Sequence, residues 1–311
     1  MKIDRGENVK VLVTGGSGYL GTVLVPKLLE KHYEVSVFDL KTPVGLRYND
    51  FTYIHGDIRN EEQCISAIEG QDAIIHLAAI VGDQACLIDQ ELAFQTNVKG
   101  TENLAKNSEG KRFIMTSTCS VYGIIEGVVS DEKTMPNPIS HYGSTKLEAE
   151  KMVATNNTDN HIIFRLGTLY GWSEQMRWDL VINTFVKHAW DFGKIRVFGG
   201  NQYRPLLHIQ DAADMLTYAV EKGKSGTYNL AYKNYTIAEV ANQIVGSLAK
   251  KKIICKIDIE NSVTDRRNYS VNCYKAKQKL AFRPKKTIPF AVEEIWGELC
   301  GTHNRNERQI G

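Results

Sequence analysis

The first half of the chain alternates between two patterns of apolar residues. Short runs of consecutive aliphatic and β-branched residues predict buried strands, and longer stretches with apolar positions every three or four residues predict helices. The expected strands lie near residues 9–13, 34–38, 52–55, 73–77, 113–118 and 162–166. The expected helices lie near residues 19–31, 61–69, 87–106 and 142–156. This alternation predicts an α/β, Rossmann-like doubly wound parallel sheet with helices on both faces.

The pattern changes beyond about residue 167. Helical stretches are expected near residues 180–190, 209–221 and 237–248, with short extended pieces near 195–198, 227–230 and 253–257. We therefore expect a smaller C-terminal lobe over residues 167–311, set over the sheet domain of residues 1–166. The polar tail, residues 301–311, is expected to fray.

A glycine-rich run joins the first expected strand to the first expected helix. Gly15, Gly18 and the following Tyr19 and Leu20 are typical of a tight turn that lets a helix N-terminus approach a diphosphate. Asp39 closes the second strand, where a carboxylate can accept hydrogen bonds from ribose hydroxyls and repels a 2′-phosphate. The run therefore predicts NAD rather than NADP, with a plain strand-to-helix turn as the alternative.

Composition and charge narrow the class of protein. The 311 residues are 42% hydrophobic, which is ordinary for a soluble globular protein, and the net charge of +2 gives no field for nucleic acid or a membrane surface. Neither a signal sequence nor an apolar stretch of about 18 residues is apparent, so a cytoplasmic location is expected. The six cysteines form no Cys-x-x-Cys pair and have no histidine cluster nearby, so neither a disulfide framework nor a metal site is expected.

Tyr142 and Lys146 stand four residues apart at the start of an expected helix, and so share one face. Hydride removal from an alcohol needs a base for the hydroxyl proton. A tyrosinate can serve if its pKa falls from about 10 toward 7, which takes roughly 4 kcal/mol of preferential stabilisation. Lys146 can supply that stabilisation, and the hydroxyl of Thr118, at the end of a strand, can share the proton. Taken alone, such a pair can equally be surface or packing residues.

Several segments together resemble the extended short-chain dehydrogenases/reductases, in particular the nucleotide-sugar epimerase and dehydratase group, over almost the whole chain. The matching pieces are Thr14 to Gly21, Gly56-Asp57-Ile58, His76-Leu77-Ala78-Ala79, Asn97 to Thr101, Ser120 to Gly123, Tyr142-x-x-x-Lys146, Arg165 through Gly171, and Arg204 with His208 and Asp211.

The resemblance implies roles for individual residues. Tyr142 would be the acid/base beside Lys146, and Thr118 stands where the family keeps its catalytic serine or threonine. Cofactor contacts are implied at Asp57, Ile58, Leu77, Ala78, Ala79 and Asn97. Asp57 and Asn97 can also be read as an ordinary turn residue and a helix-face residue. His76 is expected to be an interior histidine, and Cys119 a small buried residue.

The chain departs from the family pattern at two places. Sugar dehydratases place an Asp-Glu pair directly after the catalytic threonine, and here that pair is Cys119-Ser120, which argues against a 4,6-dehydratase. The family's substrate-contacting asparagine is replaced by Thr168.

The second lobe carries the residues that the resemblance places near a substrate diphosphate. These are Asp179, Leu180, Asn183, Arg204 and Arg267. Arginine suits this task because its planar fork donates two hydrogen bonds to phosphate oxygens, although Arg177 and Arg266 can equally be solvated. The stretch Met176 to Leu180 resembles a subgroup that includes GDP-heptose 4-dehydrogenases of bacterial polysaccharide pathways.

We therefore expect an NAD-dependent nucleotide-sugar epimerase that transiently oxidises the sugar C4 hydroxyl of a UDP-, GDP- or dTDP-linked substrate. A 4-dehydrogenase or 4-ketoreductase is the alternative within enzymes, and a non-catalytic NAD-sensing protein is the alternative outside them. The resemblance also implies a homodimer through helices 87–106 and 142–156.

Overall fold

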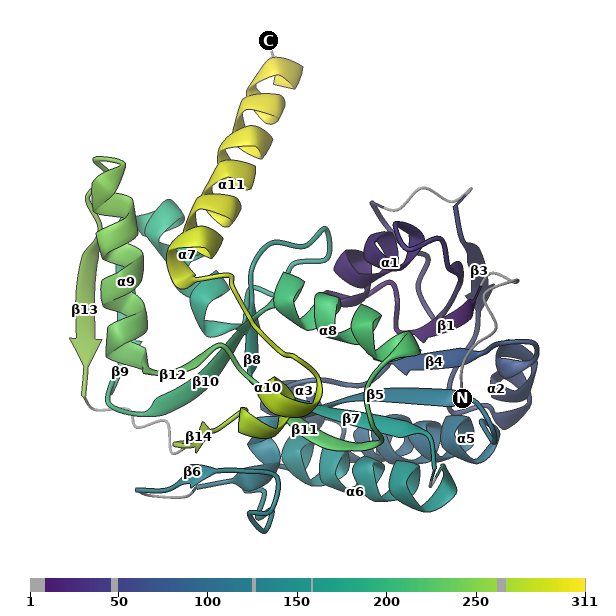
Figure 1. The fold of residues 1–311 in the computed structure, drawn as a ribbon. Helices are drawn as coiled ribbons and strands as arrows, with labels where there is room; N and C mark the ends of the chain where they lie inside the picture. Colours follow the sequence, from purple (N-terminus) through teal and green to yellow (C-terminus); the bar gives the residue numbers. More distant parts are fainter. Residues whose placement is uncertain (1–8, 46–49, 125–126, 158, 262–266, 311) are drawn as a thin grey trace.

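The computed structural model describes residues 9–45, 50–124, 127–157, 159–261 and 267–310. The strands of its main sheet are β1 (Lys10–Thr14), β2 (Glu34–Asp39), β3 (Thr52–His55), β4 (Ala73–His76), β5 (Arg112–Thr118), β7 (His161–Leu166) and β11 (Gly226–Leu230). They are ordered β11-β7-β5-β4-β1-β2-β3, and every neighbouring pair is parallel (Figure 1). The first six match the expected strands, and β1, β4 and β5 at the centre of the sheet are runs of consecutive residues of which nearly all are buried.

Helices cover both faces of this sheet. Helices α1 (Gly21–Leu29) and α8 (Ile209–Glu221) pack together on one face, and α2 (Glu61–Ile68), α5 (Gly100–Lys106) and α6 (His141–Asn156) lie on the other (Figure 1). Separate apolar cores fill the two sides, one containing Leu24 and Leu216, the other Leu104 and Ala149. The predicted doubly wound α/β architecture is confirmed.

Strand β11 corrects the expectation that the extended piece 227–230 belongs to the smaller lobe. It pairs with β7 at the edge of the main sheet, and α8 before it packs against α1. The chain therefore enters the second lobe at residue 168 and later returns to the first. Local pattern cannot reveal this, because a short buried strand looks the same whichever sheet it joins.

The single helix expected over residues 87–106 is wrong. The structure divides this stretch into α3 (Asp83–Ile88), α4 (Gln90–Phe94), a π-helical turn η1 (Gln95–Lys99) and α5. Asp89 adopts an extended backbone and caps α4 by accepting a hydrogen bond from the Leu92 amide (2.8 Å). Apolar spacing continues across such a cap, so periodicity alone misses the break.

The smaller lobe has its own apolar core. Its elements are β8 (Thr168–Tyr170), α7 (Val181–Phe192), β9 (Lys194–Phe198), β10 (Tyr203–His208), β12 (Lys233–Thr236), α9 (Ile237–Lys250), β13 (Lys256–Glu260) and α11 (Ile288–Ile310). Strand β10 lies between β8 and β12, and β13 pairs with β9. The extended piece expected at 253–257 thus begins later, at Lys256.

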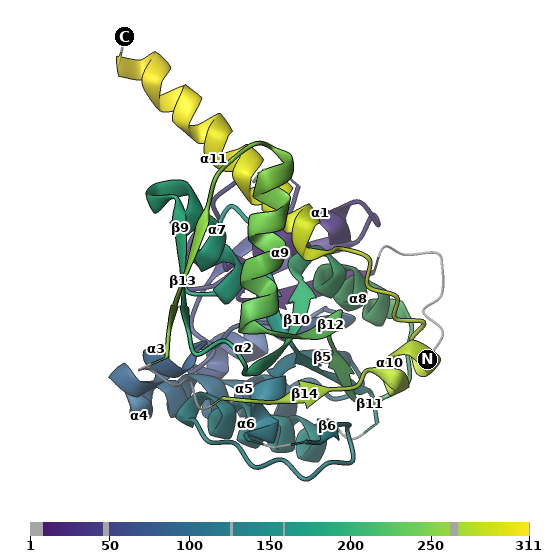
Figure 2. The ribbon, with the colours of Figure 1, turned by 90° about the vertical axis from the view of Figure 1, so that its left-hand side faces the viewer.

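Three short elements complete the fold: the 3-10 turn η2 (Cys119–Tyr122) and the paired strands β6 (Val129–Ser130) and β14 (Ser270–Val271), with α10 (Tyr274–Lys279) after them. The tail that was expected to fray continues α11 as helix to Ile310, and Figure 2 shows the C-terminal part of this helix projecting away from both lobes. Within the described ranges, no helix is both long and apolar enough to cross a membrane.

Candidate active site

The glycine turn lies where the strand order of the main sheet reverses, between β1 and β4. Gly15 has φ +73°, and a Cβ placed there would stand 2.5 Å from the Ala78 nitrogen. Only glycine therefore lets the turn approach the segment Leu77–Ala78 so closely. Ligands of doubly wound sheets bind in the crevice at this reversal.

The N-terminus of α1 has amides available for an anion. Gly18 closes the turn by donating its N–H to the Gly15 carbonyl (3.2 Å). Within the described part of the chain, the amides of Tyr19 and Leu20 donate no hydrogen bond. Two unpaired N–H groups at a helix N-terminus suit a diphosphate, so these residues fit the predicted dinucleotide.

Asp39, at the end of β2, faces the same turn. Its Oδ2 accepts a hydrogen bond from the Ser17 amide (2.9 Å), and its Oδ1 accepts one from the Lys41 amide (3.0 Å). A carboxylate has about four acceptor positions, so two remain for ribose hydroxyls. The position agrees with the predicted ribose contact.

The Asp39→Ala variant is expected to bind NADH about 10-fold more weakly and NADPH about 10-fold more tightly, because it loses two acceptors and the repulsion of a 2′-phosphate. Titration of intrinsic fluorescence with each nucleotide measures both constants. Glu30→Ala, which removes an exposed carboxylate at the end of α1, is the charge-matched control. If Asp39→Ala prefers NADH over NADPH as strongly as the wild type does, Asp39 does not contact the cofactor ribose.

The two residues predicted to hold the adenine follow β3. The Asp57 carboxylate accepts a hydrogen bond from Arg59 Nε (2.8 Å), and Ile58 is buried. Burial raises the pKa of Asp57, but the hydrogen bonds and charge of Arg59 outweigh it and hold the pKa below the usual range. Arg59 was not expected from the sequence, and it leaves Asp57 ionised beside this end of the crevice.

Asn97, in η1, is buried and bonded to the protein on every side. Its side chain accepts a hydrogen bond from the Ile80 amide (2.7 Å) and donates to the Ile80 carbonyl (2.9 Å) and to Thr145 Oγ1 (3.1 Å). Both amide hydrogens are thereby used. The structure therefore gives Asn97 a positioning task, holding the loop after Ala79 against α6.

His76 is an interior histidine, as predicted. Thr101 donates its hydroxyl proton to the Asn97 carbonyl (2.6 Å), so it accepts from His76 Nε2 (2.9 Å), and Nδ1 accepts from Thr14 (2.7 Å). Burial and the Lys146 charge lower the pKa of His76 to about 3. The ring is neutral and takes no part in acid-base chemistry near neutral pH.

Thr118 and Tyr142, two of the three residues predicted to be catalytic, lie close together at the end of β5. Thr118 is the last residue of that strand, and its hydroxyl is close enough to Tyr142 on the adjoining helix α6 to lower the pKa of the phenol. Burial raises the pKa of the Tyr142 phenol above its usual value, while the positive charge of Arg177 and the Thr118 hydrogen bond act in the opposite direction. The phenol therefore needs further positive charge before it can ionise.

Lys146 is 2% exposed, one turn along α6 from Tyr142. Burial lowers its pKa from 10.5 to about 8, although the negative charge of Glu150 raises it. Below pH 8 the folded and unfolded chains both hold the proton, and the buried charge destabilises the fold. Between pH 8 and 10.5 the folded state releases its proton first, so the penalty disappears as the pH rises.

The Lys146→Met variant is accordingly expected to raise the free energy of unfolding by about 3 kcal/mol at pH 7, and by less as the pH approaches 10.5. Urea denaturation at several pH values measures this trend. Lys151→Met, at an exposed position on the same helix, is the control. If the free energy of unfolding rises by the same amount at every pH, the buried charge of Lys146 is not the cause of the gain.

A buried ion pair supports the inner side of α6. Arg165 on β7 donates from Nη2 to Glu150 (2.7 Å) and from Nη1 to the Tyr122 hydroxyl (2.9 Å), and both charged side chains are 7% exposed. Ser117 also donates to Glu150 (2.5 Å). The pair joins α6 to β5, β7 and η2, and so fixes the helix that carries Tyr142 and Lys146.

Two arginines predicted to contact the substrate lie side by side in the second lobe. Arg204 on β10 is buried, and it donates to the carbonyls of Tyr203 (2.8 Å) and Arg267. Arg267 reaches across to the first lobe and pairs with Asp83 (3.0 Å). These cations therefore lie where the two lobes meet, whereas Asp265 and Arg266 fall outside the described residues.

Asn183 is used differently from the prediction. It is fully buried, and its side chain donates to the Tyr19 hydroxyl (3.0 Å) and the Arg177 carbonyl (3.0 Å) and accepts from the Gly171 amide (3.1 Å). Asn183 and the Tyr19 side chain therefore join α7 to the glycine turn. Neither side chain is free for a ligand, so only the backbone of Tyr19 remains for the predicted cofactor contact.

The other residues predicted to contact the substrate are Thr168, Asp179 and Leu180, and they belong to the segment that joins the two lobes. Thr168 begins β8 and is half-buried, as is Leu180, which directly precedes α7. Asp179 is exposed and pairs with Arg177, which lies 3.3 Å from the position of a Cβ on Gly82. Arg177, which could have been a solvated side chain, therefore lies between the lobes.

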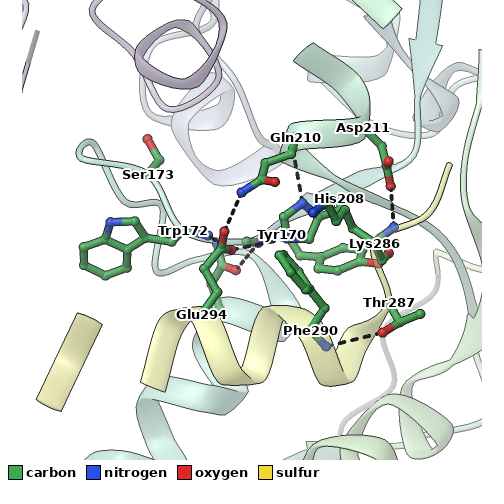
Figure 3. A network of polar contacts seen from close by, with 12 residues as sticks. Tyr170, Trp172, Ser173, His208, Gln210, Asp211, Lys286, Thr287, Phe290 and Glu294 are labelled. Carbon is green, nitrogen blue, oxygen red and sulfur yellow. Dashed lines mark hydrogen bonds and ion pairs between the residues drawn. The ribbon is translucent and has the colours of Figure 1, made fainter. Parts of the chain in front are cut away.

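A polar network anchors α11 to this region (Figure 3). Glu294 on α11 accepts hydrogen bonds from the Trp172 amide (2.8 Å) and from Gln210 (2.6 Å), and lies 3.3 Å from His208 Nε2. Asp211 accepts from the amide of Lys286, before α11 (2.9 Å). The C-terminal helix thus holds the loop after β8 against the glycine turn.

Two further residues at the site were given no role from the sequence. Ser120 Oγ lies 3.1 Å from Thr118 Oγ1 and 3.1 Å from the hydroxyl of Tyr269, which is buried. The Thr118-x-Ser120 spacing at a strand end is a usable signal for Ser120. Tyr269 lies 149 residues further along the chain, so no local pattern connects the two.

Comparison with known proteins agrees with this geometry. The model of the NAD dependent epimerase/dehydratase family matches residues 11–231. The UDP-glucose 4-epimerase of Halalkalibacterium halodurans is 27% identical over 323 residues, which cover 92% of this chain and 94% of that enzyme. The solved UDP-glucuronic acid 4-epimerase of Bacillus cereus, in complex with UDP-glucuronic acid and NAD, is 26% identical with a TM-score of 0.79, covering 93% of this chain and 98% of that one.

A third relative is matched over about half of the chain. The 3-beta-hydroxysteroid dehydrogenase of Mycolicibacterium neoaurum is 35% identical over 165 residues, which cover 50% of this chain and 45% of that protein. This chain therefore spans less than half the length of that relative. The family match covers well over half of the chain and confirms both the resemblance and the NAD dependence expected from the glycine turn and Asp39. The chain belongs to the NAD dependent epimerase/dehydratase family of extended short-chain dehydrogenases/reductases.

Proposed function

We propose that the protein is a nucleotide-sugar 4-epimerase, in which Tyr142 is the acid/base and Thr118 and Lys146 assist it. The observation that carries the proposal is the position of Thr118 at the end of β5 close to Tyr142, with the buried Lys146 one turn along α6 and Ser120 where dehydratases hold an acid. A site with one proton-transferring group suits reversible oxidation and lacks the second group that elimination of water needs.

The chain's own residues carry out the proton chemistry. Tyr142, as phenolate, accepts the proton of the C4 hydroxyl and returns it to the carbonyl oxygen in the reverse step. Lys146 and Arg177 stabilise the phenolate by their charge, and Thr118 orients the hydroxyl by a hydrogen bond. The glycine turn and Asp39 would hold NAD, which would supply the acceptor for the C4 hydrogen as hydride.

The residues proposed for substrate binding are cations between the two lobes. Arg204 and Arg267 match the diphosphate of a UDP-, GDP- or dTDP-linked sugar, because guanidinium groups bind phosphate oxygens in pairs. The Asp83 partner of Arg267 can be exchanged for such an anion. Thr168, Asp179 and Leu180 complete the proposed sugar and diphosphate contacts.

Incubation of the purified protein with UDP-, GDP- and dTDP-hexoses, followed by NMR of the products, tests the proposal. Interconversion of C4 epimers without added NAD is the expected result. Accumulation of a ketosugar with stoichiometric NADH would instead establish a 4-dehydrogenase, the reading that the Met176 to Leu180 resemblance favours. Binding of NAD with no turnover of any of these sugars would support the alternative that the chain is a non-catalytic NAD-sensing protein.

We also propose a cytoplasmic homodimer, with the interface on the helices of residues 83–106 and 141–156. Leu87 and Ile88 on α3 support an interface there, because their side chains are 53% and 87% exposed. Light scattering of the purified protein is expected to give twice the 35.0 kDa chain mass. A monomer at micromolar concentration would contradict this interface.

A further inference from the structure

A row of hydroxyl groups connects Tyr142 to Tyr269 through Thr118 and Ser120. Thr118 is close enough to the Tyr142 phenol to lower its pKa by hydrogen bonding, Thr118 Oγ1 donates to Ser120 Oγ (3.1 Å), and Ser120 Oγ lies 3.1 Å from the Tyr269 hydroxyl. Tyr269 is 5% exposed and lies at the far end of the row. The acid that a dehydratase would carry is thus replaced by a hydroxyl bonded to a second tyrosine.

The ring of Tyr269 is held in place by contacts that do not involve its hydroxyl. Asn268, beside it, accepts a hydrogen bond from the Tyr203 amide (2.9 Å), and Ser270 follows it in β14, which pairs with β6. The Arg204 guanidinium stands over the ring, 5.5 Å from its centre. Removing the hydroxyl alone therefore leaves the ring packed.

The direction of the hydrogen bonds depends on whether Tyr142 is ionised. Each hydroxyl has one proton to donate, so the row can point only one way at a time. With Tyr142 neutral, Thr118 donates to Ser120. When Tyr142 loses its proton, Thr118 donates to the phenolate, Ser120 donates to Thr118, and Tyr269 donates to Ser120. Aligned bonds of this kind strengthen one another.

We propose that Tyr269 is a positioning residue for the reaction, stabilising the Tyr142 phenolate through Ser120 and Thr118. The inference rests on the proposed role of Tyr142 and deepens it. It connects the segment after Arg267 to the acid/base through the hydroxyl groups of Ser120 and Thr118.

The surroundings of the two tyrosines bear on which of them ionises and which keeps its proton. Arg177, Cys86 and Tyr269 act on the Tyr142 phenol by their charges, and of these only the Arg177 cation lowers its pKa. Arg204, Arg267 and Cys119 surround Tyr269. Burial raises the pKa of Tyr269, despite Arg204 and the Ser120 hydrogen bond, so Tyr269 keeps the proton that it must donate.

The test is a pH titration of tyrosinate absorbance in the NAD-bound protein, with the Tyr142 transition identified as the one missing in Tyr142→Phe. The Tyr269→Phe variant is expected to raise the pKa of that transition by about one unit, since one hydrogen bond is lost from the row. Ser120→Ala, which breaks the row at another point, is expected to give the same shift, and the double variant no more than either single one.

Tyr203→Phe is the matched control, because it removes the hydroxyl of an exposed tyrosine on β10 beside Arg204. An unshifted Tyr142 transition in both Tyr269→Phe and Ser120→Ala would overturn the inference. The titration uses no sugar substrate, so it separates the two proposals: a shifted transition with no epimerase turnover would contradict only the proposed function. If the wild type shows no Tyr142 transition, both proposals are wrong.

Turnover gives a second readout. In Tyr269→Phe the acidic limb of the kcat/KM profile is expected to move up by about one pH unit, so that the loss is about 10-fold at low pH and vanishes at high pH. KM is expected to stay within about two-fold, because the arginines are unchanged. A loss of the same size at every pH would show a merely structural role and overturn the inference.

Discussion

The Tyr142→Phe variant is expected to lose about 10³-fold in kcat while its Kd for NAD stays within about two-fold of wild type. General acid-base catalysis by one positioned group contributes about 10²–10⁴-fold to a reaction rate. Among the described residues of the site, none besides Tyr142 is proposed to take the proton of the sugar hydroxyl. The ring itself remains, so packing beside the cofactor turn is preserved. Steady-state kinetics with the best nucleotide sugar and fluorescence titration with NADH measure the two quantities.

Ser144→Ala, on the exposed side of the same first turn of α6, is the control and is expected to keep wild-type kcat. A Tyr142→Phe variant with more than a tenth of the wild-type kcat would remove Tyr142 from the acid/base role. A variant that also fails to bind NAD would leave the loss of turnover without a catalytic explanation and would count equally against the proposal.

The Arg165→Met variant is expected to lower the free energy of unfolding by about 3–5 kcal/mol. It leaves the Glu150 carboxylate buried without its cation and takes a hydrogen bond from Tyr122. Removing one partner of a buried pair is much more costly than replacing both, so Glu150→Gln combined with Arg165→Met is expected to recover part of the loss. Urea denaturation followed by circular dichroism measures all three proteins.

Arg196→Met, an exposed arginine on β9, is the matched control and is expected to change the free energy of unfolding by less than about 0.5 kcal/mol. An Arg165→Met variant within about 1 kcal/mol of wild type would show that the pair does not hold α6 in place. Because α6 carries Tyr142 and Lys146, the same variant is also expected to lose turnover below its unfolding transition.

The main sheet and the cofactor turn could be predicted from the sequence because their signals are local. Strands such as β4 and β5 are uninterrupted runs of buried residues, and Gly15 and Asp39 are separated by one strand-helix-strand unit. Tyr142 and Lys146 share a helix face by spacing alone. Such features need no knowledge of how distant segments pack.

Other parts of the site depend on contacts between distant segments. Tyr269 reaches Ser120 only because β14 pairs with β6, and the side chain of Asn183 is taken up by Tyr19 only because α7 docks on the glycine turn. Similarly, β11 joins the main sheet by pairing with β7. The family resemblance implies ligand contacts for Asn183 and Asn97, and in the structure their side chains also hydrogen-bond the protein itself.

The most direct test of reversible hydride transfer at C4 uses a nucleotide sugar that carries deuterium at C4. NMR of the equilibrium mixture is expected to show deuterium retained at C4 in both epimers, with none released to solvent. This follows because the hydrogen that leaves as hydride returns to the same carbon, while Tyr142 handles only the hydroxyl proton. Loss of the C4 deuterium, or solvent hydrogen incorporated at C5 with release of water, would contradict it.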